Sequence, residues 1–392
     1  MVPRDALFTL QQLAGYYPVV AVTGPRQSGK TTLARIAFPN KPHASLEDPD
    51  VREFAQTDPR GFLARYPDGV ILDEAQRVPD LFSYLQTAVD ADKRAGRFVL
   101  TGSQQFGLLA GISQSLAGRA GLVHLLPFSL AELTDIAPPP DLETLLWRGA
   151  YPPLHDQNIP PGVWNRDYIA TYVERDLRQL VNVRDLSAFR RFVRMCAARS
   201  GQALNLSALA ADCGVRHNTA KSWISVLEAS YLVFLLPPHH KNFGKRLVKT
   251  PKLYFYDTGL AAVLAGVRDV QALGLGAMRG PLFETWAVAE FVKYRSNRGL
   301  APELYYWRDN NGNEIDLVID RGDGLFPVEF KSGQTLAGDW TAPLQKFMTW
   351  SGGKQAALVY GGAQRQTRDS VAVFGWRDIG ACAAAAYGVA RT

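Results

Sequence analysis

The feature that most constrains the fold is a glycine-rich segment, Gly24-Pro-Arg-Gln-Ser-Gly-Lys-Thr31, between two runs of contrasting pattern. The apolar run "YYPVVAVTG" leads into it as a buried strand, and "TTLARIAF" follows it as a helix. Backbone N–H groups bind phosphate in a loop of the form G-x-x-x-x-G-K-[ST] that joins a strand to a helix. The segment therefore predicts a nucleotide-binding α/β domain with a parallel sheet.

The chemistry of this loop assigns its expected contacts. Lys30 should reach the β- and γ-phosphates of ATP, and Thr31 should hold Mg²⁺. We expect ATP and Mg²⁺ as cofactors, with the nucleotide bound by Gly24, Pro25, Arg26, Gln27, Ser28, Gly29, Lys30, Thr31 and Thr32.

Two further apolar runs, "GVILDE" and "RFVLTGS", end in polar residues. Ligands of parallel sheets bind beyond the carboxyl ends of the strands, where these residues should meet the loop. We expect Asp73 to bind Mg²⁺ and Glu74 to polarise the attacking water. After the second run, Thr101, Ser103 and Gln104 are candidate sensors of the γ-phosphate, and the sequence does not choose among them.

Arg119 lies among small residues in "SLAGRAG". An arginine in this setting can enter the ATP site of a neighbouring subunit and stabilise transition-state charge, or it can be a surface arginine. The catalytic interpretation predicts a homo-oligomer, of which a hexameric ring is one form.

The segment 204–239 has the pattern of a winged helix-turn-helix, with Gly214 at the turn. The second helix of such a motif can enter a DNA groove, and a basic hairpin beside it suits phosphate contacts. DNA is therefore an expected partner, although the module can equally serve as a packing lid. The candidate DNA-binding residues are Arg216, His217, Asn218, Lys221, Lys241, Lys245, Arg246 and Lys249, and the hairpin also carries Lys252.

The tail contains a strand pattern, "FPVEFKSG", in which Glu329 and Lys331 share one face. Together with Asp316 and the helical Glu284, they match the groups of a metal-dependent nuclease of the restriction-endonuclease-like type. A second divalent metal at Glu284, Asp316 and Glu329, with Lys331 beside it, is the resulting prediction. Cleavage and simple clamping of DNA both remain open.

Length and composition bound the remaining questions. A chain of 392 residues exceeds one compact core, and we expect domains at 1–136, 137–260 and 261–392. The net charge of +6 is compatible with nucleic acid. The three cysteines are scattered, and neither a signal peptide nor an apolar stretch of about 18 residues is evident. We therefore expect a cytoplasmic protein without a membrane span.

The P-loop, "ILDEAQ", "LTGSQ", "LAGR" and "PFS", followed by "YVERDLRQL", "GPLFETWAVAEF" and "PVEFKSG", give the chain a family resemblance along most of its length. It resembles AAA-superfamily ATPases that carry a C-terminal domain of unknown function, DUF4143. The resemblance implies an AAA-type P-loop ATPase with a C-terminal DUF4143 domain, and the residues above add a winged-helix middle region and a PD-(D/E)xK nuclease-like C-terminal domain. From these parts together we expect an α/β protein that couples ATP hydrolysis to work on DNA, as a motor or clamp in recombination, repair or defence. The alternatives are a nucleotide-switched regulatory protein with an inactive tail and an ATP-gated nuclease.

Overall fold

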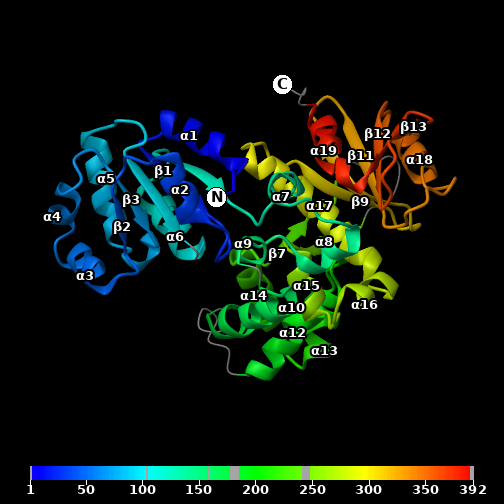
Figure 1. Ribbon diagram of the computed structural model, residues 1–392, viewed down its shortest axis with the longest axis horizontal. Coiled ribbons are helices and arrows are strands. Elements are labelled where there is room, and N and C mark those ends of the chain that lie inside the picture. The colour runs from blue at the N-terminus through cyan, green and yellow to red at the C-terminus, as the bar shows by residue number, and fades with distance from the viewer. Residues whose placement is uncertain (1, 103–104, 158, 177–184, 241–247, 389–392) are drawn as a thin grey trace. The chain divides into compact units, whose positions relative to one another are not determined.

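The computed structural model describes residues 2–102, 105–157, 159–176, 185–240 and 248–388, and omits the side chains of 105, 106 and 174–176 (Figure 1). The chain forms two compact units. The N-terminal unit comprises Met1–Phe128, Ala229–Tyr231 and Arg295–Leu300. The C-terminal unit comprises Ser129–Glu228, Leu232–Tyr294 and Ala301–Thr392.

The N-terminal unit is built on a five-stranded parallel sheet of order β2-β3-β4-β1-β5. This confirms the predicted α/β fold with a parallel sheet. Its strands are β1 (Val19–Thr23), β2 (His43–Ser45), β3 (Val70–Asp73), β4 (Phe98–Gly102) and β5 (Ala120–His124). Its helices are α1 (Ala6–Tyr16), α2 (Lys30–Ala37), α3 (Pro49–Thr57), α4 (Pro59–Ala64), the 3₁₀ turn η1 (Ala75–Arg77), α5 (Leu81–Ala91) and α6 (Gln105–Ser115).

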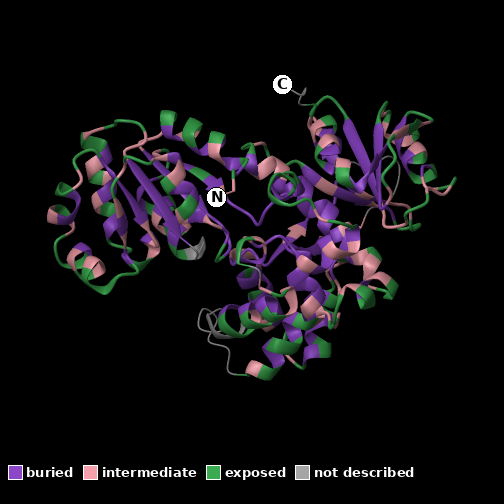
Figure 2. Cartoon of the chain, viewed as in Figure 1, coloured by how far each residue is buried: buried purple, intermediate pink, exposed green. Residues whose placement is uncertain are grey.

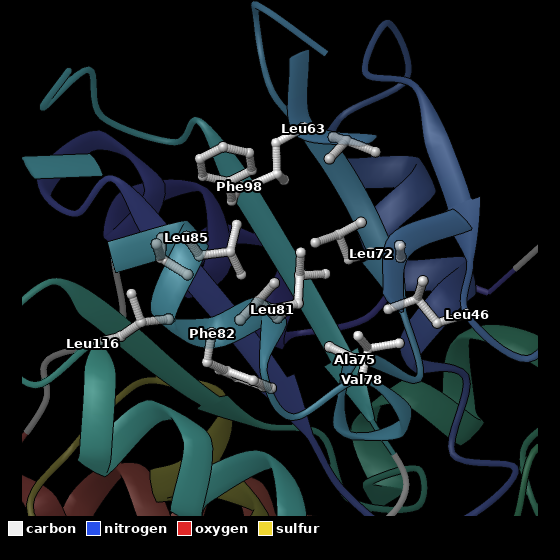
Figure 3. Close-up of a cluster of buried hydrophobic side chains, with 14 of the residues drawn as sticks. Leu46, Leu63, Leu72, Ala75, Val78, Leu81, Phe82, Leu85, Phe98 and Leu116 are labelled. Atoms are coloured by element: carbon white, nitrogen blue, oxygen red, sulfur yellow. The ribbon is translucent and has the colours of Figure 1, made fainter. Parts of the chain in front are cut away.

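Helices cover both faces of this sheet, so its central strands β1 and β4 are buried along their whole length (Figure 2). Alternate strand residues face opposite layers, because side chains alternate along a strand. Val20, Val22 and Val99 pack with α1 and α2 on one face. The larger cluster on the other face, shown in Figure 3, joins Leu72 and Phe98 to α4 and α5.

The C-terminal unit begins with a helical region. Its helices are α7 (Leu130–Ile136), α8 (Leu142–Arg148), α9 (Pro153–Asp156), α10 (Pro161–Tyr168), the π-helix η2 (Ile169–Asp176), α12 (Leu186–Ala198), α13 (Leu206–Cys213), α14 (His217–Ala229), α15 (Thr258–Leu264) and α16 (Val270–Leu275). A three-stranded antiparallel sheet accompanies them in the order β6-β8-β7, formed by β6 (Gln202–Ala203), β7 (Val233–Leu236) and β8 (Lys252–Phe255).

A six-stranded mixed sheet of order β13-β14-β12-β11-β10-β9 completes the unit. Its strands are β9 (Leu304–Arg308), β10 (Glu314–Asp320), β11 (Leu325–Lys331), β12 (Ala356–Tyr360), β13 (Gln366–Arg368) and β14 (Val371–Gly375). The helices of this part are α17 (Arg279–Asn297), α18 (Ala342–Ser351), the 3₁₀ turn η3 (Trp376–Asp378) and α19 (Ile379–Tyr387). The last residues of α17 belong to the N-terminal unit.

Local sequence signals set several helix starts. Ser129 and Glu132 form a reciprocal capping box at α7, which satisfies two backbone N–H groups that a helix start leaves free. Asp257 accepts hydrogen bonds from the backbone of Leu260 and Ala150 and so begins α15. Within the described ranges, no helix is long and apolar enough to cross a membrane.

Candidate nucleotide site and carboxylate cluster

The predicted phosphate loop runs from the end of β1 to the start of α2. Three of its residues have a positive φ, which residues other than glycine rarely adopt. Gly24 and Gly29 have φ of 150° and 90°, and Gln27 has φ of 64°. A Cβ atom at Gly24 would lie 2.1 Å from the carbonyl oxygen of Leu125, so no other residue fits there. These conformations give the chain the sharp turn between strand and helix that a phosphate-binding loop needs.

Lys30 lies buried at the first position of α2. Its ammonium donates to the carbonyl oxygens of Gly24, at 3.2 Å, and Pro25, at 2.8 Å. Burial lowers the pKa of Lys30 to about 8, although Glu74 and Asp73 oppose the shift. The loop carbonyls thus hold the ammonium over the loop, where the phosphates of a nucleotide would accept its hydrogen bonds.

Asp73, at the end of β3, joins the loop to two neighbouring strands. Thr31 Oγ1 donates to Asp73 Oδ1 at 2.9 Å, and the hydroxyl of Thr101, the last but one residue of β4, donates to the same oxygen. His43 Nε2 lies 3.9 Å from the other carboxylate oxygen. A hydroxyl and a carboxylate in contact at a helix start are the ligands that Mg²⁺ takes beside a bound triphosphate.

Glu74 follows Asp73 in a left-handed conformation with φ of 53°, which a residue other than glycine rarely adopts. Its carboxylate accepts a hydrogen bond from the side-chain amide of Gln76. Strained backbone of this kind clusters at functional sites, because the surrounding structure must hold it in place. Ser103 and Gln104, the other candidate sensors, lie outside the described residues.

Arg4 is a contact of the loop that no motif in the sequence indicates. The residue is only 8% exposed, and its guanidinium donates to the carbonyl oxygens of Ser28 (2.8 Å) and Leu126 (2.7 Å) and stacks on Phe128. Arg4 fastens the phosphate loop to the segment that follows β5.

Thr23, the residue before the loop, is held by a second group of buried contacts. Its hydroxyl lies 2.8 Å from His124 Nδ1 and 2.7 Å from the hydroxyl of Tyr231, which has a left-handed φ of 55°. Burial lowers the pKa of His124, so the ring is neutral and can accept one of these hydrogen bonds.

Arg119 lies at the amino ends of the strands, whereas the phosphate loop lies at their carboxyl ends. It precedes β5, whose first residue, Ala120, pairs with Val19 at the beginning of β1. From Val19 to Thr23, which precedes the loop, the strand rises by about 13 Å. The guanidinium is bound to the carboxylate of Asp90 at 2.6 and 3.0 Å. The Arg119 side chain is thus held by Asp90, and its backbone lies at the end of the strands opposite to the phosphate loop.

The structure brings together the acids predicted in the C-terminal unit. Asp316 and Glu329 are cross-linked through the backbone: Phe330 N–H donates to Asp316, and Asp316 N–H donates to Glu329. Asp316 lies at a register shift between β9 and β10, a type of irregularity that re-aims a side chain. Lys331 is paired with Glu329 at 2.7 Å. A cavity of about 540 Å³ opens beside these residues.

A lysine from outside the predicted metal set lies beside two of the predicted acids, Glu284 and Asp316. Lys252 of β8, which the sequence placed among the phosphate-binding residues of a hairpin, is buried and bound to Glu284 (2.9 Å) and Glu314 (2.5 Å). It lies 3.9 Å from Asp316. The prediction for Lys252 was therefore wrong, because its ammonium is enclosed by carboxylates and cannot reach DNA. Its contact with Glu314 was not foreseen either.

The predicted second metal site is not supported. Over the described ranges, no group of three or more His, Cys, Asp or Glu side chains is arranged to hold a metal ion. Burial, together with the charge of Asp316, raises the pKa of Glu284 to about 7 and that of Glu329 to about 8. A carboxyl group must lose its proton before it can bind a metal ion, and a raised pKa makes that loss harder. Glu284 and Glu329 are in addition already paired with lysines.

Most of the predicted DNA-binding residues that the structure describes share one end of α14. Arg216, His217, Asn218 and Lys221 are exposed there, while Trp223, Ile224 and Leu227 bury the opposite face. Lys249 is exposed before β8. Lys241, Lys245 and Arg246 lie outside the described residues.

Comparisons with known proteins agree with this geometry. An AAA domain matches residues 16–134, a domain of unknown function (DUF8612) matches 139–271, and another (DUF4143) matches 279–379. The chain is thus a P-loop protein of the AAA class. Two uncharacterized mycobacterial proteins, Rv2008c of Mycobacterium tuberculosis and Mb2031c of Mycobacterium bovis, are each 34% identical over 336 residues, covering 85% of this chain and 74% of theirs. The chain belongs to their family. In this chain the AAA domain precedes the DUF4143 domain.

Among solved structures, the Walker-type ATPase of Pyrococcus abyssi is similar, with a TM-score of 0.43 and 15% identity over 66% of this chain and 94% of that one. A nucleotide-bound DnaA of Aquifex aeolicus has a TM-score of 0.30 and 15% identity over 57% of this chain and 85% of that one.

Proposed function

We propose that this protein is a Mg²⁺-dependent ATPase whose hydrolysis is coupled to work on DNA. The observation that carries the proposal is the convergence of Lys30, Thr31, Asp73 and Thr101 at the carboxyl edge of the parallel sheet. In the proposed site, Lys30 binds the β- and γ-phosphates, and Thr31 and Asp73 hold Mg²⁺. Glu74, in its strained conformation beside Asp73, orients and polarises the attacking water.

The proposed site is completed by a second copy of the chain. Arg119 lies at the amino end of β5 and is paired with an exposed aspartate, Asp90, which supports a role in a neighbouring subunit. An arginine delivered to the γ-phosphate neutralises charge that develops in the transition state. We therefore propose a homo-oligomer, with a ring as its closed form.

The proposed partner is DNA. The element order α12, β6, α13, α14, β7, β8 supports a winged helix, with α14 as its second, recognition-type helix. The exposed Arg216, His217 and Lys221 lie at the N-terminal end of that helix, where such motifs contact DNA. Because these residues are few and only mildly basic, we propose contacts with phosphate rather than a specific base sequence.

The C-terminal unit is proposed to have a nuclease-like fold that binds without cutting. Support for the fold comes from α17, the antiparallel strands β9, β10 and β11, and the parallel strand β12 after α18. Support for a non-catalytic role comes from the lysines paired with Glu284 and Glu329. The alternative is an ATP-gated nuclease, which the presence of Asp316, Glu329 and Lys331 together would favour.

The test is an ATPase assay with and without duplex, single-stranded and branched DNA, with cleavage measured in the same samples. We expect hydrolysis that requires Mg²⁺, rises with at least one form of DNA and leaves that DNA intact. The double variant Arg216→Ala/Lys221→Ala should lose the stimulation and keep the basal rate.

Each other outcome points to one alternative. Hydrolysis unchanged by every form of DNA would indicate a nucleotide-switched regulatory protein. Cleavage abolished by Lys331→Ala would establish the nuclease. No hydrolysis by the oligomeric protein in the presence of Mg²⁺ would overturn the proposal itself.

A further inference from the structure

A second cavity, of about 450 Å³, lies among the helices of the C-terminal unit and shares no residue with the cavity beside Glu329. Its walls come from α8, α10, η2, α12 and α15, which pack on one another within this unit (Figure 1). Small-molecule sites usually have volumes of about 300–1,000 Å³. The cavity therefore has the size of a ligand site, and none of the functions proposed above uses it.

The base of this cavity is apolar. Phe189 and Val193 of α12 and Leu264 of α15 are at most 5% exposed, and Trp147 of α8 lies beside them in the lining. Apolar and aromatic side chains of this kind contribute most of the contact area in small-molecule sites. The deep part of the cavity is thus suited to a hydrocarbon or aromatic group.

One wall is formed by the π-helix η2, which continues directly from the α-helix α10. Ile169, Ala170 and Val173 of η2 line the cavity. A π-helix is a rare conformation that occurs frequently at functional sites. Its presence at this wall is an observation independent of the volume and of the apolar base, and it also points to a site.

Four arginines line the same cavity, and all four are exposed: Arg166 of α10, Arg190 and Arg194 of α12, and Arg268 after α15. None of the described residues in the lining is an Asp or a Glu. In the described part of the chain, no carboxylate forms an ion pair with Arg166, Arg194 or Arg268. Arg190 and Arg194 are one helical turn apart, a spacing at which like charges repel. The mouth of the cavity therefore carries positive charge for which the lining supplies no counter-charge.

We propose that this cavity binds a small amphipathic anion, with its apolar body against the base and its carboxylate or phosphate head among the arginines. The planar guanidinium group binds both kinds of head through paired hydrogen bonds. A neutral apolar molecule would leave the arginines without counter-charge, and a DNA backbone would leave the apolar base unfilled. The inference goes beyond the proposed ATPase and does not depend on it.

The test is isothermal titration calorimetry of the full-length, nucleotide-free protein with decanoate, decyl phosphate and decylammonium, each below the concentration at which it forms micelles. We expect one molecule of at least one of the two anions to bind, and the cation of the same length not to bind. The comparison of decanoate with decyl phosphate identifies the head. The homologue shorter by two methylene groups should bind about tenfold more weakly, because each buried methylene adds to the hydrophobic contribution.

Two variants separate the head from the body of the ligand. Arg194→Gln/Arg268→Gln should weaken binding of the anion about tenfold or more, since hydrogen bonds to charged groups are lost. Ala170→Trp, at an exposed position of the lining, should block binding by filling the cavity while all four arginines remain. Arg191→Gln/Arg199→Gln removes two arginines beside or at the end of α12 that do not line the cavity, and should bind as the wild type.

Thermal unfolding of each protein shows that it is folded, and the exposure of Ala170, Arg194 and Arg268 predicts melting temperatures close to the wild type. Any of four results would overturn the inference: no binding of either anion, equal affinity for decylammonium, unchanged affinity in either lining variant, or equal weakening in the control. If neither amphiphile binds and Arg194→Gln/Arg268→Gln loses affinity for DNA, the arginines serve nucleic acid instead.

Discussion

The hydroxyl of Thr31 donates a 2.9 Å hydrogen bond to Asp73, although 42 residues separate the two in sequence. This contact links the first turn of α2 to the carboxyl end of β3. The contact holds both proposed Mg²⁺ ligands in one place. Such preorganisation lowers the entropy that binding must overcome.

Glu74→Gln should abolish most of the hydrolysis while leaving ATP binding intact. A glutamine keeps the size of the side chain but cannot accept the proton of the attacking water, and loss of a general base typically costs about 10²–10⁴-fold in rate. Phosphate release and nucleotide binding are measured on the same preparation. Glu47→Gln, which changes an exposed acid of the same unit, is the matched control. A kcat within a few-fold of the wild type would assign the role elsewhere.

Arg119→Ala should bind ATP normally and hydrolyse it poorly, because in the proposed oligomer the missing charge would act in the neighbour's site. Mixing this variant with Lys30→Ala subunits, which retain Arg119, should restore activity to the mixed oligomer. Arg94→Ala removes another surface arginine that is paired with aspartates, and it should have no effect. A protein that remains monomeric by size with and without ATP contradicts the prediction.

Arg4→Lys should raise the KM for ATP and change kcat less. A lysine keeps the charge but cannot bridge the carbonyl oxygens of Ser28 and Leu126, which the guanidinium does. Leaving a buried carbonyl without its donor costs about 1–3 kcal/mol, which would displace the phosphate loop. Steady-state kinetics measure the split, and Arg35→Lys, on an exposed face of α2, serves as control. An unchanged KM would show that the loop holds its shape without Arg4.

Glu329→Gln should remove a pH dependence of stability. Burial and the charge of Asp316 raise the pKa of Glu329 to about 8, whereas an unfolded chain gives it an ordinary value near 4.5. The folded state therefore binds the proton more tightly, and this contribution is complete below the ordinary value and lost as pH rises through 8. We expect the melting temperature of the wild type to fall between pH 6 and pH 9, in a window assigned from these two pKa values.

In Glu329→Gln the fall over the same window should be smaller, since no proton is exchanged at that position. Glu303→Gln, at an exposed position of the same unit, should behave as the wild type. Equal slopes for wild type and Glu329→Gln would contradict the assignment.

Much of the nucleotide site could be predicted from the sequence, because its chemistry depends on short segments. Gly24, Lys30 and Thr31 are adjacent to one strand and one helix, and Asp73 ends another buried strand. Parallel strands bring such ends to one edge of the sheet whatever their order. The signals for Arg4 and Tyr231 were absent, since their contacts join segments that are distant in sequence.

Contacts between segments that are distant in sequence also determine the environment of the acids in the C-terminal unit. The sequence by itself determined that Asp316, Glu329 and Lys331 would lie together, because a hairpin and the alternation of a strand place them there. It also determined the family through the order of its motifs. Only the tertiary structure decided which cation faces Asp316 and Glu284, since Lys252 reaches these two acids from another sheet. The periodicity of apolar and polar residues in the sequence indicates which face of a helix or strand a side chain lies on. The partner of a buried charge depends instead on how separate helices and strands pack together.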